Sequence, residues 1–117
     1  MVSINEFAAF DIRVGRITEV GDIEGARKPM YRLKVDLGEL GLKGVAAGIK
    51  DFYAPEQLLG RSVVVVANLD PKNIAGFVSE GMVPAAESPD GKVMLLRPDE
   101  DLPPGSRIRY GNKTRLR

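Results

Sequence analysis

Residues 63–67, four valines and an alanine, constrain the fold more than any other stretch of this chain. The run is too short for a stable helix, and an unbroken row of valines is typical of a strand buried on both faces. We therefore expect a central strand there. Polar residues follow it at once, and side chains at the end of a rigid strand are well placed for recognition. The alternative is a solvated loop with an edge strand.

The first third of the chain predicts a short helix and two strands. Ser3 and Glu6 form a capping-box pattern, which predicts a helix over residues 4–9. In residues 12–17 the alternation of apolar and polar residues shifts by one position after Gly15, which indicates a bulge or sharp bend in a long strand. Residues 30–37 alternate strictly, so one face is core and the other is mostly basic. The core side carries Tyr31, Leu33, Val35 and Leu37, and the outer side carries Arg32, Lys34 and Asp36.

The remaining segments complete an all-β pattern. We expect a weak strand over residues 42–47, a short helix over 55–59, a core strand over 92–96 and a closing strand over 107–110. Residues 77–86 also resemble a strand, interrupted at Gly81 and at Pro84, which argues for an edge or a bulge. This order fits a five-stranded Greek-key barrel of the OB type with short N-terminal and inter-strand helices. An SH3-like barrel or a small sandwich also fits the pattern.

Composition sets the outer bounds. A chain of 117 residues is expected to be a single domain over residues 1–117. The absence of cysteine and histidine removes disulfides, thiol nucleophiles and the commonest metal ligands and general base, so we expect no metal, no cofactor and no catalysis. No apolar run is long enough to cross a bilayer and no signal pattern opens the chain, so we expect a cytoplasmic protein. A net charge of +1 does not by itself indicate nucleic-acid binding.

Four motifs in register carry a family resemblance. They are Asp-Ile-Arg-Val-Gly-Arg-Ile at residues 11–17, Val-Val-Ala-Asn-Leu at 65–69 with Pro-Lys at 71–72, Gly-Phe-Val-Ser-Glu-Gly-Met at 76–82, and residues 95–105. Together they resemble the tRNA-binding domain. This module is found at the C-terminus of bacterial methionyl-tRNA synthetases, in free-standing dimeric tRNA-binding proteins, in endothelial monocyte-activating polypeptide and in the export-related chaperone CsaA. The resemblance spans about residues 7–108 and favours the OB barrel.

Within that family the closer likeness is to CsaA. The loops at residues 26–29 and 74–77 resemble those of CsaA. Residues 47–49 instead stand near the Ser-Gly-Ile of the synthetase appendages. Residues 79–82, Ser-Glu-Gly-Met, nearly match the signature Ser-Gln-Gly-Met, and Glu80 adds a negative charge there. The subfamily therefore stays open between these two.

The resemblance implies binding of tRNA without catalysis, and it implies the contacting residues Asn68, Lys72, Ser79 and Met82. Strand alternation adds Arg32 and Lys34, and Arg13 and Arg16 are further cations for phosphate. Aromatic residues are sparse, so we expect recognition of folded RNA by shape and backbone. Each residue also has a structural interpretation: Met82 as a core filler, Ser79 as a strand hydroxyl, Lys72 as a solvated loop residue and Asn68 as a turn former.

Two other functions compete with RNA binding. A CsaA-like chaperone would bind unfolded or precursor peptides in an apolar groove formed by Phe52, Tyr53, Ile74, Phe77 and Met82. An enzyme would use Ser79 with Lys72 or Lys50, but nothing in the sequence brings these residues together.

Homodimerisation is expected because the N-terminal helix and the interrupted late strand are too small to be fully packed in a monomer. The resemblance also implies that residues 1–10 lie at a dimer interface. The residues expected there are Ile4, Phe7, Phe10, Val83, Pro84, Ala85, Ile108 and Tyr110. Residues 107–117 form a basic C-terminal segment without acids, with Arg107, Arg109, Lys113, Arg115 and Arg117, that contacts RNA or is a solvated terminus.

Overall fold

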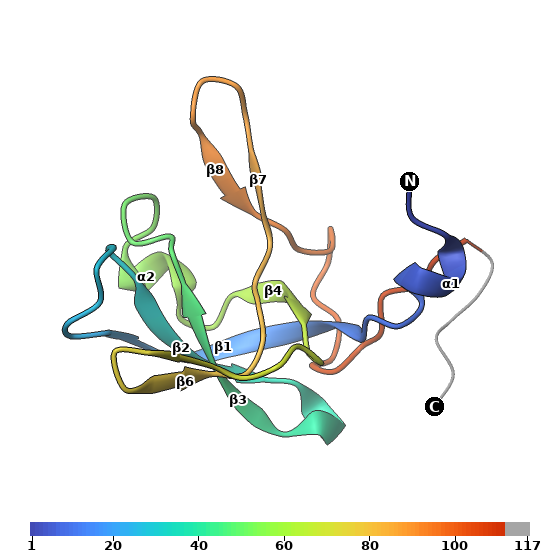
Figure 1. Ribbon diagram of the computed structural model, residues 1–117, viewed down its shortest axis with the longest axis horizontal. Helices are drawn as coiled ribbons and strands as arrows, with labels where there is room; N and C mark the ends of the chain where they lie inside the picture. The colour runs from blue at the N-terminus through green and yellow to red at the C-terminus, as the bar shows by residue number, and fades with distance from the viewer. Residues whose placement is uncertain (112–117) are drawn as a thin grey trace.

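The computed structural model describes residues 1–111, and most of its regular structure is β (Figure 1). The elements are α1 (Ile4–Phe7), β1 (Ile12–Asp22), β2 (Tyr31–Asp36), the 3-10 helix η1 (Gly38–Leu40), β3 (Leu42–Ala47), α2 (Pro55–Leu58), β4 (Ser62–Val66), β5 (Lys72–Ile74), β6 (Phe77–Ser79), β7 (Ala85–Glu87) and β8 (Val93–Leu95). The all-β class is confirmed. Both predicted helices are present, each slightly shorter than expected.

One antiparallel sheet has the order β3-β2-β1-β4, and β1 joins its two halves. The first part of β1 pairs with β4 and the second part with β2. The register shifts between Ile17 and Glu19, so the predicted bulge exists but lies beyond Gly15. Gly15 serves another purpose, because a Cβ there would lie 2.4 Å from Cγ1 of Val35. The phase slip thus reflects close packing at Gly15 and a bulge at Thr18.

The core lies on one face of β2 and the strands beside it. Tyr31, Leu33, Val35 and Leu37 are all buried while Arg32 and Lys34 are exposed, which confirms the predicted alternation. Residues of β3, β4 and β8 complete the apolar cluster. The outer face of β2 therefore stays open to solvent.

The valine-rich strand β4 is buried, but its predicted central position is wrong. It forms one edge of the four-stranded sheet, and the central strands are β1 and β2. Its outer edge is covered by backbone instead: Val64 N donates to Leu96 O at 3.2 Å, and Val66 exchanges hydrogen bonds with Met82. Because these short segments pair with its outer edge, β4 is as buried as a central strand.

Residues 79–82 bond to both edges of this sheet. Glu80 N donates to Gly44 O of β3 at 2.8 Å, while Met82 bonds to Val66 of β4. Gly81 allows this approach, because a Cβ there would lie 2.8 Å from Val66 O. The predicted strand over residues 77–86 is accordingly divided into β6 and β7. In the described part of the chain, the named strands form a four-stranded sheet and two hairpins, so the closed five-stranded barrel stays a prediction.

The chain ends beside β1. Arg107 forms an isolated bridge to Arg13, and Ile108 N donates to Ile12 O at 2.9 Å, in place of the predicted closing strand over residues 107–110. Lys113, Arg115 and Arg117 of the predicted basic segment lie outside the described residues. Within residues 1–111, no helix has the length and apolar character that a membrane span requires.

Candidate nucleic-acid interface

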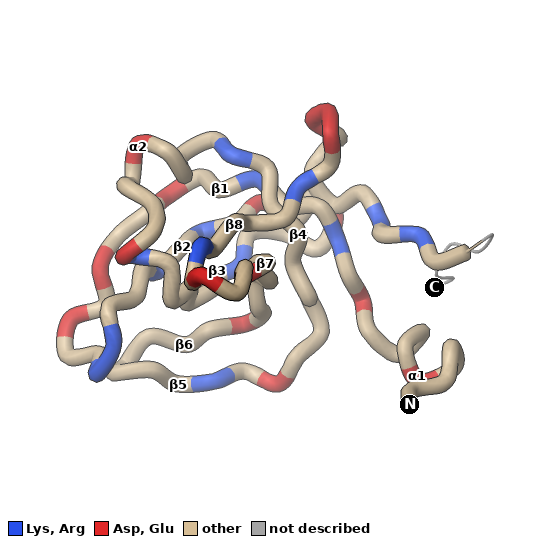
Figure 2. Tube along the Cα trace, turned by 90° about the horizontal axis from the view of Figure 1, so that it is seen from above, with Lys and Arg blue, Asp and Glu red and all other residues tan. Residues whose placement is uncertain are grey.

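Three adjoining hollows meet at Met30, between the β1–β2 loop, the β5–β6 hairpin and residues 79–82. Figures 1 and 2 both show this loop beside the turn of the hairpin, and Gly25 faces Ala75 there. We name this surface the Met30 groove. Its lining includes Ala26, Arg27, Lys28, Met30, Leu69, Asp70, Lys72, Ile74, Ser79 and Met82.

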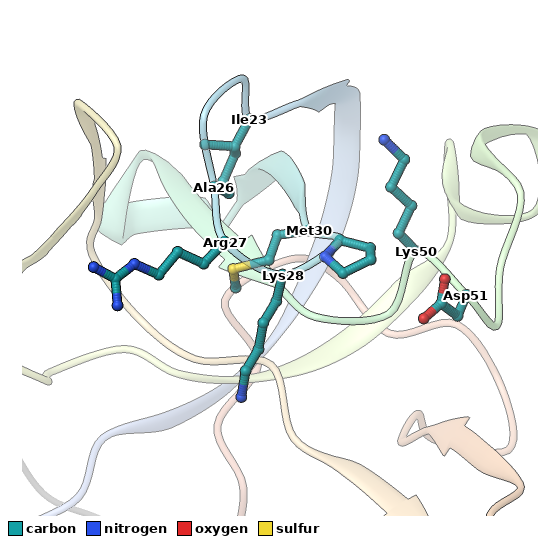
Figure 3. Close-up of a pocket in the computed structure, with 8 residues that line it drawn as sticks. Ile23, Ala26, Arg27, Lys28, Met30, Lys50 and Asp51 are labelled. Atoms are coloured by element: carbon teal, nitrogen blue, oxygen red, sulfur yellow. The ribbon is translucent and has the colours of Figure 1, made fainter.

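Cations line much of the Met30 groove. Arg27, Lys28 and Lys72 are exposed, and none of them forms an ion pair with the described residues. Figure 3 shows the side chains of Arg27 and Lys28 extending in different directions beside Met30. Lys50, at the end of the groove, is paired with Asp22 at 2.8 Å, and this hydrogen bond raises the pKa of Lys50. Asp51 and Asp70 line the groove as well but pair with none of these three cations, which therefore remain unpaired for an anionic ligand.

Ser79 holds one wall of the groove in place. Its Oγ accepts a hydrogen bond from Ala46 N at 2.9 Å and donates to Gly81 O at 3.2 Å. The residue is 6% exposed, so this hydroxyl is engaged within the protein. Met82 follows with its backbone bonded to β4 and its side chain 43% exposed. Ser79 thus positions the wall on which Met82 offers a free apolar surface.

Asn68 joins the end of β4 to the N-terminal segment. Its Oδ1 accepts from Asp11 N at 2.8 Å, and its Nδ2 donates to Ala9 O at 2.8 Å. The amide is therefore committed to two backbone groups far away in the sequence. Asn68 does not line the Met30 groove, although its neighbours Leu69 and Asp70 do.

Arg32 and Lys34 lie on the outer face of β2, over β1. The guanidinium of Arg32 covers Gly21, and its Nε donates to Asp22 O at 3.2 Å. Lys34 pairs with Glu19 at 3.2 Å, and both side chains are about half exposed. Such an exposed pair contributes little and can open for a phosphate. Of the six predicted RNA-contacting residues, the structure brings Lys72, Ser79 and Met82 together in the groove and leaves Arg32, Lys34 and Asn68 outside its lining.

Arg13 is not available to phosphate, contrary to the expectation from the sequence. It is 4% exposed and bonded to Asp11 at 2.7 Å, to Glu39 at 3.2 Å and to Gly105 O at 3.0 Å. The hydrogen bonds that Arg13 donates to the Asp11 carboxylate raise the pKa of Arg13 above its ordinary value. Arg13 therefore joins the two ends of the chain to η1.

Arg27, Lys28 and Met30 are the groove residues that sequence reasoning left out of the site. Arg27 and Lys28 were recognisable as cations in a loop, and residues 26–30 contain no acid. The sequence pattern did not show that this loop lies against the β5–β6 hairpin, which comes more than forty residues later in the chain.

The five apolar residues predicted to form a peptide groove do not lie together. Tyr53 is 7% exposed, and its hydroxyl accepts from Leu95 N at 3.0 Å, so it belongs to the core. Phe52 lies beside it with 46% exposure. Ile74 and Met82 line the Met30 groove instead, and Phe77 packs against Gly44 of β3. Because Tyr53 is buried, it cannot form part of the predicted peptide groove.

The residues expected at a dimer interface form two groups. Phe7 contacts Phe10 and Tyr110, with ring centroids 6.3 and 5.7 Å apart, and Ile4 is 60% exposed nearby. The second group, Val83, Pro84 and Ala85, leads into β7, which begins at Ala85, and Val83 packs on the core. Figure 1 shows α1 at the end of the molecule where the described chain ends, and the β7–β8 hairpin projecting from the sheet.

Comparison with known proteins identifies similar sequences and similar structures. Residues 12–107 match the family described as putative tRNA binding domain. The chain is 46% identical over 114 residues to methionine–tRNA ligase of Thiobacillus denitrificans, covering 92% of this chain and 16% of that protein. A CsaA chaperone from Picrophilus torridus superposes with a TM-score of 0.85 at 42% identity, covering 92% of this chain and 99% of that one. A protein from Pyrococcus horikoshii described as related to methionyl-tRNA synthetase gives 0.83 at 35% identity, covering 92% and 97%.

The chain therefore belongs to the tRNA-binding domain family. It spans about a sixth of the length of the methionine–tRNA ligase, and nearly the whole length of the CsaA chaperone.

Proposed function

We propose that this protein binds folded tRNA without catalysing a reaction, and that the Met30 groove is the centre of the binding surface. The observation that carries the proposal is the set of three cations along this groove, Arg27, Lys28 and Lys72, without acidic partners among residues 1–111. Family membership and the likeness to methionine–tRNA ligases support tRNA as the partner.

The chemistry of the groove suits recognition of backbone and shape. Neutralising phosphates with lysine and arginine releases counterions, which gives affinity largely independent of base sequence. Met30, Ile74 and Met82 provide an apolar floor, but no aromatic ring lines the groove within the described residues. Extensive base stacking is therefore not expected. Arg32 and Lys34, on the solvent-exposed side of β2, extend the positive surface for a ligand as large as tRNA.

Fluorescence anisotropy with labelled tRNA at several salt concentrations tests the proposal. Saturable, salt-sensitive binding that unlabelled tRNA displaces better than duplex DNA is expected. The absence of binding at low salt would refute it.

Lys72→Ala tests the groove itself. If Lys72 neutralises one phosphate, its loss should weaken tRNA binding across sequences and lower the salt-dependence slope by about one unit. Lys43→Ala, which removes the same charge outside the groove, is the matched control. An unchanged slope in Lys72→Ala would place this residue outside the interface.

A second candidate function is peptide binding by a chaperone, and the likeness to two CsaA chaperones favours it. Half-exposed Met82 with Ile74 and Leu69 would offer apolar contacts in the same groove. Adding an unfolded peptide to the tRNA titration separates the functions. Peptide binding without tRNA binding would favour the chaperone, and competition between the two would place both ligands in the groove.

A further inference from the structure

A second hollow lies between α2, the turn before it and β8, and it shares no lining residue with the Met30 groove. Its volume of about 380 Å³ is within the range of pockets that hold small ligands. We name it the cationic hollow. The lining residues that supply its cationic, polar and apolar groups are Phe52, Gln57, Arg61, Lys92, Met94 and Arg97.

The walls of the cationic hollow are held together by Tyr53. Its buried hydroxyl accepts a hydrogen bond from Leu95 N of β8 at 3.0 Å. The guanidinium of Arg61 lies over its ring, with Cζ 5.2 Å from the centroid. Val64 N also donates to Leu96 O at 3.2 Å, which fixes β8 beside β4. The hollow is therefore formed before any ligand arrives, which reduces the entropic cost of binding.

The charge of the hollow is uncompensated. Arg61, Lys92 and Arg97 form no ion pairs with the described residues, and Nε of Arg61 is buried without a hydrogen-bond partner. Asp101 lies near this region, but its carboxylate accepts from Ser62 Oγ at 3.0 Å and reaches none of the three cations. A concave surface with three such cations attracts an anion.

Apolar groups complete the lining of the hollow. Phe52 is 46% exposed and Met94 is 48% exposed, so neither apolar side chain is packed into the core. An exposed ring beside cations can stack on a nucleobase while the cations bind phosphate. Gln57 lines the same hollow, with its Oε1 accepting from Ala54 N at 2.7 Å and its Nε2 left to donate.

We propose that the cationic hollow binds one phosphorylated nucleotide, with the phosphate on Arg61, Lys92 and Arg97 and the base against Phe52. The nucleotide is either free or a single-stranded nucleotide of a bound RNA, because both present the same phosphate and base. This site stands apart from the Met30 groove and does not depend on it.

Titration of the ¹⁵N-labelled protein with adenosine monophosphate, followed by amide resonances, tests the proposal. We expect saturable shifts at residues around the cationic hollow, and weaker binding of adenosine or inorganic phosphate alone. The double variant Lys92→Gln/Arg97→Gln should lower the affinity at least about tenfold, because charged hydrogen bonds contribute strongly. Both side chains are exposed, so the variant should fold, and its amide spectrum verifies this.

The control Lys43→Gln/Arg109→Gln removes the same charge elsewhere and should bind adenosine monophosphate like the wild type. Absence of shifts around the hollow, equal affinity in the hollow variant, or equally strong binding of inorganic phosphate would each overturn the proposal.

Anisotropy with tRNA then identifies the source of the nucleotide. Weaker tRNA binding by the hollow variant, with competition by adenosine monophosphate, indicates a nucleotide of the RNA. Unchanged tRNA binding indicates a free nucleotide. A wild type that binds adenosine monophosphate but not tRNA would refute the proposed function and leave this inference standing.

Discussion

Gly15 shows how closely β1 packs on the rest of the core. A Cβ at this position would lie 2.4 Å from Cγ1 of Val35 and 2.9 Å from Cδ2 of Leu37, and both side chains are fully buried. Those branched side chains cannot move away without disturbing their own neighbours. A single methyl group is therefore enough to strain the sheet.

Gly15→Ala should accordingly lower the free energy of unfolding by about 1–3 kcal/mol through overpacking. Urea denaturation measures it as a lower midpoint. Gly48→Ala is the matched control, since nothing lies within 4 Å of a Cβ there, and its midpoint should stay near that of the wild type. Equal midpoints for both variants would contradict the close contact.

Arg13 makes the ion pair that matters most for stability. Its side chain is 5% exposed and that of Asp11 is 17% exposed, so removing Arg13 takes a hydrogen-bonded cation away from a largely buried carboxylate. Arg13→Met should cost at least about 3 kcal/mol, as breaking buried pairs does. Lys34→Met removes one partner of an exposed pair and should cost less than about 1 kcal/mol. Thermal and urea denaturation of the two variants should show this difference, and similar losses would show that burial of the Arg13 pair is unimportant.

At the scale of the element, α1 depends on its capping box. Ser3 N donates to Glu6 Oε1 and Glu6 N donates to Ser3 Oγ, both at 3.1 Å. The bond from Ser3 N to the carboxylate, followed by the interaction with the Ser3 hydroxyl, lowers the pKa of Glu6 below its ordinary value of 4.5. A lowered folded-state pKa means that the carboxylate stabilises the helix above the ordinary pKa. That contribution is lost as the pH falls through the folded-state value.

Ser3→Ala should therefore bring the pKa of Glu6 back toward its ordinary value, because the helix start that holds the carboxylate is weakened. A carbon-detected NMR titration of the Glu6 carboxyl measures this. Ser106→Ala, which removes a hydroxyl that donates to Pro103 O and takes no part in the capping box, serves as the control and should leave Glu6 unchanged. A Glu6 titration that Ser3→Ala does not alter would show that the box is absent in solution.

At the scale of the whole molecule, α1 has no buried residue of its own. Ile4 is 60% exposed and Phe10 is 44% exposed, beside the ring of Phe7. Apolar side chains gathered on so short a helix are better explained by contact with a second copy than by solvent exposure. We therefore propose a homodimer in which α1 and residues near Tyr110 meet their counterparts.

Light scattering across micromolar concentrations should give a dimeric mass for the wild type and a monomeric mass for Phe10→Glu, because a charge cannot be buried unpaired at the interface. Leu59→Glu changes an exposed apolar residue after α2, 60% exposed against 44% for Phe10, and should stay dimeric. A monomeric wild type, or a dimeric Phe10→Glu, would count against this interface.

Patterns in the sequence were enough to predict the all-β class, the strict alternation of β2, both short helices and the family. These follow from local periodicity, capping patterns and ordered motifs, which act over a few residues. The motif that matches the family also indicated Lys72, Ser79 and Met82, which line the Met30 groove, and their contact with RNA stays a prediction.

What each polar residue is free to bind depends on the folded arrangement of the chain. Arg13 and Lys72 are both cations next to apolar strands, yet one is enclosed by Asp11 and Glu39 while the other lines a groove. Tyr53 and Phe52 are adjacent aromatics, yet one is core and the other exposed. Such differences depend on contacts between residues far apart in the chain. Local pattern carries no information about those contacts, and therefore the Met30 groove and the cationic hollow appear only in the folded molecule.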